Sequence, residues 1–154
     1  MATQYTAGLT QGQKLTADIM NQIGAAWETW TPTVTQSGTF TFTNNISRYT
    51  RVNKLVIATT YVQFTNNAGV AGNAVNMSIP IAAQSNSGQM MAFGFIYDSS
   101  ANTLYNVTAQ TTVNASTIAF YQGMATGGSL FGVVPNLALA TSDQMRITII
   151  YEAA

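Results

Sequence analysis

The sequence contains no cysteine and no histidine, and only 6% of its residues are Asp, Glu, Lys or Arg. Without cysteine the chain forms no disulfide bond, so packing or association between copies must stabilise it. The absence of both residue types argues against a zinc site and against a serine nucleophile activated by histidine. The five basic and five acidic residues balance, so no net field attracts nucleic acid or an anionic membrane. We therefore expect no nucleic-acid partner.

Long hydrophobic runs are also missing. The nearest candidate, residues 90–97, is far shorter than the ~18 apolar residues that a membrane helix requires, so we expect no membrane insertion. The first residues show no basic segment followed by an apolar run, so no secretory signal is expected. A chain of 154 residues is long enough to build one domain around one core.

Carboxylates are too few and too scattered to suggest catalysis. Glycoside hydrolysis requires two carboxylates across a cleft, and the five available ones are Asp18, Glu28, Asp98, Asp143 and Glu152. Local structure explains most of them, because Asp18 suits the start of a helix and two others lie in turn contexts. The sequence predicts a protein that is not an enzyme and that binds no metal and no cofactor.

The chain is instead rich in apolar and neutral polar residues. Hydrophobic residues make up 47% of the sequence, and Thr, Ser, Asn and Gln replace ions as the groups that keep the surface hydrated. One segment, residues 15–24, has the signals of a short helix: Thr16 at the N-cap, Asp18 in the first turn and Gly24 at the C-terminus. Its apolar edge, formed by Ile19, Ile23 and Trp27, must pack against the domain or another copy.

From residue 30 onward the hydrophobic period is two, which is typical of strands. Alternation predicts strands at 39–43, 74–79 and 145–152, with further candidates at 55–64, 89–97, 104–109 and 117–121. Segments rich in Gly, Asn and Ser separate them. The fold class that this pattern predicts is mainly β: an antiparallel β-sandwich of jelly-roll type, preceded by a short N-terminal helix. We divide the chain into an attachment segment, residues 1–28, and a β-domain, residues 29–154.

Two of the predicted strands, 55–64 and 89–97, are apolar on both faces. In the first strand, Val56, Ala58, Val62 and Phe64 occupy one face. Leu55, Ile57 and Tyr61 occupy the other face. A domain of this size covers only one face of a sheet with its own core, so the second face is expected to contact a neighbouring subunit. We therefore assign Leu55, Ile57 and Tyr61 to an interface between subunits.

Two clusters of side chains are candidates for ligand contact. Arg48, Arg51 and Lys54 form a small basic cluster, which either contacts phosphate or is simply a solvated hairpin; the second interpretation is favoured because three charges make a weak footprint. The other cluster combines aromatic rings with amides near predicted loops, as in sites that hold neutral sugars. Its members are Tyr97, Asn102, Tyr105, Tyr121 and Gln122. The alternative for these tyrosines is ordinary packing along strands.

The order of four segments, 9–23, 26–35, 46–56 and 145–153, resembles the small tail-fibre and receptor-binding proteins of tailed bacteriophages. The motifs that carry the resemblance are Trp27-Glu-Thr-Trp-Thr-Pro, Ser47-Arg-Tyr-Thr-Arg-Val-Asn-Lys, and the closing Met145-Arg-Ile-Thr-Ile-Ile-Tyr. The chain departs from the pattern at Trp30, where Tyr is common, and at Ser47 and Asn53, where Gly is common. Asn at 53 still fits a hairpin turn because it tolerates a positive φ.

This resemblance implies a homotrimeric virion protein, assembled in the host cytoplasm. Its N-terminal segment joins other tail or neck proteins, and its β-domain faces host surface glycans. Two alternatives remain open: a purely structural virion component, such as a neck or collar fibre or a capsid decoration protein, and a cellular carbohydrate-binding module or lectin. The last of these would be expected to carry a fusion partner, a linker or a signal.

Overall fold

The computed structural model describes residues 26–84, 91–111, 116–122 and 129–154. The predicted helix at 15–24 lies outside these residues. Within them the protein is mainly β, as the alternating pattern predicted, and no helix occurs. The described part accordingly contains no helix long and apolar enough to cross a membrane.

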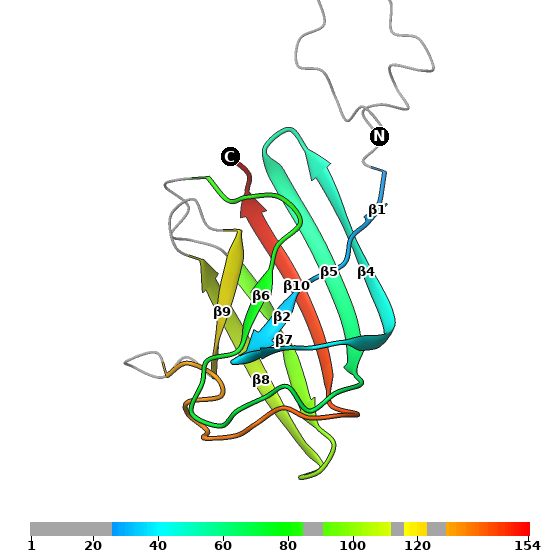
Figure 1. Ribbon diagram of the computed structural model, residues 1–154. Helices are drawn as coiled ribbons and strands as arrows, with labels where there is room; N and C mark the ends of the chain where they lie inside the picture. The colour runs from blue at the N-terminus through cyan, green and yellow to red at the C-terminus, as the bar shows by residue number, and fades with distance from the viewer. Residues whose placement is uncertain (1–25, 85–90, 112–115, 123–128) are drawn as a thin grey trace, which may run out of the picture.

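Ten strands make up the domain, and every pairing between them is antiparallel. They are β1 (Glu28–Thr29), β2 (Val34–Gln36), β3 (Gly38–Thr39), β4 (Phe42–Val52), β5 (Leu55–Phe64), β6 (Asn76–Ser78), β7 (Met91–Asp98), β8 (Thr103–Thr111), β9 (Thr117–Gln122) and β10 (Gln144–Glu152). Their order in space is β1-β4-β5-β10-β7-β8-β9-β6-β2-β3. Figure 1 shows the long strands β4, β5, β10, β7 and β8 running side by side.

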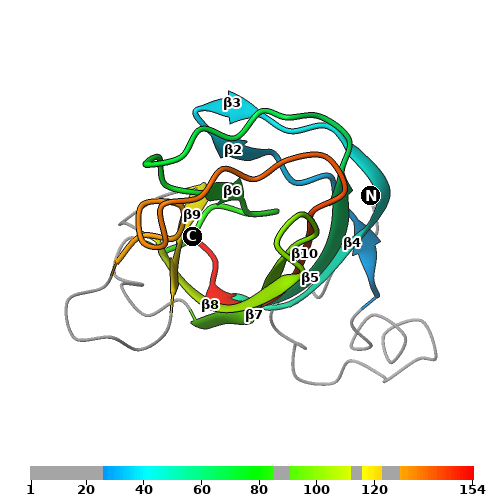
Figure 2. The ribbon, with the colours of Figure 1, turned by 90° about the horizontal axis from the view of Figure 1, so that it is seen from below.

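Hydrogen bonds join all the strands into one sheet rather than the two separate sheets of a sandwich. The sheet curls into a half-barrel, so that β2 and β6 lie opposite β5 and β10 across the core (Figure 2). Two strands of the sheet approach closely at Gly94 in β7, where a Cβ atom would meet the backbone oxygen of Arg146 in β10 at 2.0 Å. Close approach of this kind requires a residue without a side chain.

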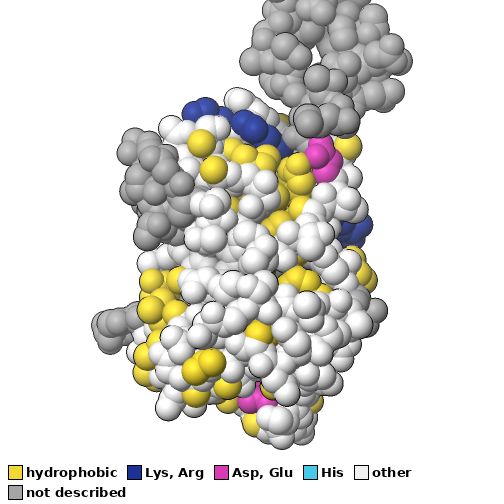
Figure 3. Space-filling view, viewed as in Figure 1, with side chains coloured by type: hydrophobic (Ala, Val, Ile, Leu, Met, Phe, Trp, Pro, Cys, Tyr) yellow, Lys and Arg dark blue, Asp and Glu magenta, His cyan; other side chains and the backbone are white. Residues whose placement is uncertain are grey.

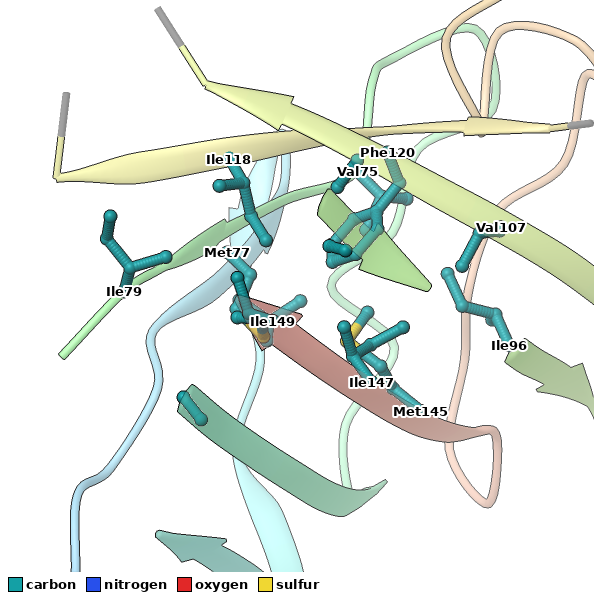
Figure 4. Packing of buried hydrophobic residues seen from close by; sticks show 14 of the residues in the cluster. Val75, Met77, Ile79, Ile96, Val107, Ile118, Phe120, Met145, Ile147 and Ile149 are labelled. Atoms are coloured by element: carbon teal, nitrogen blue, oxygen red, sulfur yellow. The ribbon is translucent and has the colours of Figure 1, made fainter. Parts of the chain in front are cut away.

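The concave side of the sheet forms the core. In β5 every second residue from Val56 to Phe64 is buried, and β10 alternates in the same way. Figure 4 shows side chains of β10, β7, β8, β9 and β6 pointing toward one another. Met77 and Met145 are completely buried there, which agrees with the use of methionine to fill gaps. The period-two pattern therefore identified the inner face correctly.

One predicted strand, residues 39–43, is divided in the structure. Ser37 has a positive φ of 73°, and the chain reverses there, so that β2 and β3 pair with each other. Phe40 then lies between β3 and β4 and stacks on Phe64 in β5, with ring centroids 4.3 Å apart. The alternation of Phe and Thr therefore reflects burial of the aromatic side chains. It does not correspond to one continuous strand.

The half-barrel has two distinct ends. At one end, which we call the terminal end, lie the β4–β5 hairpin at residues 52–55 and the C-terminus, joined by a hydrogen bond from Ala153 N to the Lys54 oxygen at 2.7 Å. Asn53 in this hairpin has a φ of 54°, as its sequence context predicted. The opposite end, which we call the loop end, consists of residues 65–74, 98–102 and 132–143 (Figure 1).

Candidate binding surfaces

Buried side chains hold the loop end together. Asp98, at the end of β7, is only 8% exposed. Its Oδ1 atom accepts hydrogen bonds from the backbone and hydroxyl of Ser100 and from the backbone of Ala101. Burial acts to raise the pKa of Asp98, but these hydrogen bonds outweigh burial and leave the pKa below its ordinary value. The carboxylate therefore fixes the β7–β8 turn.

A second buried carboxylate ties this turn to β10. Asp143 is 1% exposed, and its Oδ1 accepts hydrogen bonds from the backbone and hydroxyl of Ser99 at 2.8 and 3.0 Å. Its Oδ2 accepts one from the Ala140 backbone at 2.8 Å. These contacts bring residues from distant parts of the chain together, and they place both carboxylates in structural roles, as their turn contexts suggested.

An amide holds the remaining loops. Gln36 in β2 is completely buried, and its Nε2 donates hydrogen bonds to the backbone oxygens of Asn73 and Leu137 at 3.1 and 2.7 Å. Its Oε1 accepts one from the Leu139 backbone at 2.9 Å. Three backbone groups, of which that of Leu139 belongs to a buried residue, are thereby satisfied. No sequence pattern indicated this role of Gln36, because its partners come from loops without periodicity.

Of the five residues predicted to bind glycan, the structure brings two together. The Tyr97 hydroxyl donates a hydrogen bond to Asn102 Oδ1 at 2.8 Å, and Asn102 is exposed in the β7–β8 turn with a φ of 49°. Both belong to the edge of the loop end. This pair is neutral and combines a ring with an amide, as the sugar interpretation requires.

The other three lie elsewhere. Tyr105 pairs with the buried Ile96, so it points to the inner face, and its ring meets Phe131 edge-on with centroids 5.4 Å apart. Tyr121 pairs with the exposed Thr108 and so faces outward, whereas its neighbour Gln122 faces the other side of the sheet. Tyr105 therefore shows the strand packing that we considered as the alternative, and the five side chains do not share one surface.

The convex side of the sheet carries a second candidate surface, which we call the outer face. It consists of the outward residues of β4, β5, β10, β7 and β8. Most of the exposed large apolar side chains among the described residues lie on it: Ile46, Val52, Leu55, Phe93, Leu104 and Ile150. Phe93 is 52% and Leu104 54% exposed. The residues predicted to form the trimer interface all lie here, with Leu55 exposed and Ile57 and Tyr61 half-buried.

Arg146 lies near the middle of the outer face. It is flanked in register by Tyr61 on β5 and Phe95 on β7. The carbon at the centre of its guanidinium lies 4.5 Å from the Tyr61 ring centroid and 5.6 Å from that of Phe95. Among the described residues no carboxylate lies within ion-pair distance of it. Sequence reasoning missed this arrangement, although Arg146 is a charged residue in the interior of a mainly apolar strand.

The side chains of the basic cluster, Arg48, Arg51 and Lys54, all contact nearby residues. Arg48 lies over the Trp27 ring at 5.3 Å, and Arg51 donates a hydrogen bond to the Asn53 oxygen. Lys54 forms an ion pair with Glu152 at 3.8 Å. These contacts match the interpretation of a solvated hairpin. Figure 3 shows how few charged side chains lie on the face that carries β2 and β6.

Two tyrosines near the terminal end also have shifted pKa values. The Tyr49 hydroxyl donates a hydrogen bond to Glu28 Oε2 at 2.7 Å, and this bond, with burial and the charge of Glu28, raises the Tyr49 pKa. Burial raises the pKa of Tyr151 to about 12, and its hydroxyl donates to the Ile81 oxygen at 2.7 Å. Both pKa values keep the hydroxyls neutral, and neither creates a base.

Within the described residues, no three His, Cys, Asp or Glu side chains lie close enough together to hold a metal ion. Comparison of the chain with protein-family models, with curated proteins and with solved structures finds no match. Interpretation of the surfaces therefore rests on their geometry and chemistry.

Proposed function

We propose that this protein is a non-enzymatic component of a bacteriophage virion, in a tail fibre or tail tip, that attaches to host surface glycans as a homotrimer. The observation that carries the proposal is the separation of the two ends of the domain. The chain enters the sheet through β1, which pairs with β4, while the loop end, in which the carboxylates of Asp98 and Asp143 are buried, lies on the opposite side of the molecule. A particle attached through residues 1–28, including the short helix expected there, would present the loop end outward.

The chemistry of the loop end supports contact with neutral polar ligands. Hydroxyl and amide groups of Ser100, Asn102, Thr141 and Asn136 belong to exposed positions there, and the carboxylates of Asp98 and Asp143 are turned inward. Because the loops are held by buried hydrogen bonds, little conformational entropy is lost when a sugar binds. Three copies on one axis would offset weak contacts at each site through avidity.

The acidic residues of the described chain support a role without catalysis. Asp98 and Asp143 are committed to turns, Glu28 accepts the Tyr49 hydroxyl, and Glu152 pairs with Lys54. Carboxylates with these partners are not poised for proton transfer across a cleft. The virion setting, with assembly in the host cytoplasm, comes from the resemblance of the sequence and is part of the same proposal.

A purely structural virion component is the second candidate. The observation that favours it is that Tyr97 and Tyr105 point to opposite faces of the sheet, so the aromatic residues do not form one sugar platform. Such a protein would have the same fold and symmetry but no receptor.

A binding assay on host cells and a glycan array separates the two candidates. Asn102→Gly removes the exposed amide but keeps the positive φ of 49°. We expect it to lower binding by about tenfold, as for the loss of a hydrogen bond worth ~1.4 kcal/mol. Asn53→Gly is the matched control, because it makes the same change at the terminal end, where φ is 54°. Absence of binding by the unmodified protein would contradict receptor attachment and favour the structural component.

A further inference from the structure

We infer that the outer face is the surface on which a second copy of this chain packs, with the row Tyr61–Arg146–Phe95 at its centre. This inference rests on the homotrimer of the proposed function but not on the glycan or on the virion. It also extends the predicted contact, formed by Leu55, Ile57 and Tyr61 on β5, across β10 to β7. Three features of the surface lead to it.

The first feature is apolar exposure on a regular sheet. Phe93, Leu104 and Ile150 are 52%, 54% and 37% exposed on neighbouring strands. Backbone groups in the middle of a sheet are already paired, so a partner has to cover side chains and not strand edges. Monomeric proteins seldom expose an apolar patch larger than a few hundred Å² without a function for it.

The second feature is area. Five strands at a spacing of ~4.8 Å, each with about nine residues rising ~3.3 Å, cover roughly 700 Å². A stable interface of standard size requires ~800 Å² from each partner. In the proposed trimer two neighbouring copies share this face, and together they bury about as much surface as one specific protein–protein contact requires.

The third feature is the kind of polar group between the apolar ones. Thr59, Thr148 and Thr108 form one row across the face, and Gln63 and Gln144 belong to another. Hydroxyls and amides both donate and accept hydrogen bonds, so they find partners in a second copy of the same chain. Rows of like charge would repel such a copy.

Arg146 fits the centre of such an interface. A guanidinium stacked on aromatic rings is weakly hydrated and keeps its planar array of donors free. Arginine, tyrosine and phenylalanine are the residue types enriched in the cores of protein interfaces. The hydroxyls of Thr59, Thr148 and Thr108 on the outer face of a neighbouring copy offer acceptors to these donors. Its stacking fixes the side chain before association, which lowers the entropy lost on binding.

Substitutions that place a charge on the outer face test the inference. Phe93→Lys and Ile150→Lys both change exposed positions, so the fold should survive, as circular dichroism would verify. The matched control is Val70→Lys, which changes a side chain that is 49% exposed at the loop end. By light scattering at micromolar concentration, we expect the unmodified chain and Val70→Lys to be oligomers, and the outer-face variants to weaken association at least tenfold.

Protection of single cysteines gives an independent readout, because the natural sequence contains none. We expect a thiol in Leu104→Cys to react with a maleimide at least tenfold more slowly than one in Val70→Cys, and Phe93→Lys to abolish the difference. Equal rates, or an oligomer that persists in both lysine variants of the outer face, would overturn the inference. Glycan binding is measured separately, so an oligomer that binds no glycan would contradict only the receptor function.

Discussion

At the scale of single residues, one buried amide and two buried carboxylates hold the loops of this protein together. Gln36, Asp98 and Asp143 satisfy backbone groups of loops that share no regular pairing. Each of these side chains is buried, so its hydrogen bonds form in a low dielectric, where an unpaired group is costly. The loop end consequently owes its shape to a few residues, and single substitutions should reveal this.

Replacing Gln36 by leucine should destabilise the domain strongly. The side chains are of similar size, but the change removes three hydrogen bonds and leaves the backbone groups of Asn73, Leu137 and Leu139 unpaired. We expect a loss of about 3 kcal/mol in the free energy of unfolding, measured by urea denaturation. Gln110→Leu, at an exposed position of β8, is the control and should change stability little. A similar small change in both variants would contradict the role of Gln36.

Tyr151 should make stability depend on alkaline pH. Its pKa rises from 10.0 to about 12 in the folded state, so its contribution is fully present below pH 10 and is lost as pH rises toward 12. The contribution is roughly 2 kcal/mol. Stability of the natural protein should therefore fall more steeply between pH 10 and 12 than that of Tyr151→Phe. Parallel curves from urea titrations at each pH would refute this account.

At the scale of elements, the sequence predicted several long strands well but missed most of β4, the longest strand among the described residues, of which the alternating pattern covered only residues 42 and 43. The predicted strand at 55–64 coincides with β5, and the one at 145–152 differs from β10 by one residue. Alternation is reliable there because one face of each strand is buried against a continuous core. It failed around residues 37–42, where the turn at Ser37 depends on a positive φ that the neighbouring residues did not indicate.

The candidate site was less predictable than the strands. Tyr97 and Asn102 belong to one hairpin, so their proximity follows from local sequence. Predicting the positions of Tyr105, Tyr121 and Gln122 required knowing which face of each strand points inward. The sequence patterns of β8 and β9 are mixed, so they did not show this. The curl of the sheet and the buried amide of Gln36 arise from contacts between residues far apart in the chain. Such contacts leave no periodic signal.

Gly94 tests whether close strand approach sets the curl of the sheet. In Gly94→Ala the new Cβ would meet the Arg146 oxygen at 2.0 Å and the Ile147 Cα at 2.9 Å. Because both atoms belong to backbone, β7 and β10 have to separate, and we expect a loss of about 3 kcal/mol. Thermal unfolding provides the measurement, with Thr108→Ala on the neighbouring strand as the control. Equal melting temperatures for the natural and Gly94→Ala proteins would show that the approach is not required.

At the scale of the whole molecule, the division between attachment segment and β-domain needs one adjustment. The predicted boundary, between residues 28 and 29, falls within β1, and Glu28 both pairs with Tyr49 and accepts its hydroxyl. A deletion intended to spare the domain should therefore end at residue 25. We expect the shortened protein to keep its strand content and melting temperature but to be absent from particles. Unfolding of the shortened protein, or its normal incorporation, would contradict the division.

In the proposed trimer, copies packed through their outer faces would direct three loop ends toward the host. The mass of the complete natural protein, measured by native mass spectrometry at micromolar concentration, tests this claim most directly. The account predicts three times the chain mass of 16.4 kDa. A single chain at every concentration tested would contradict it.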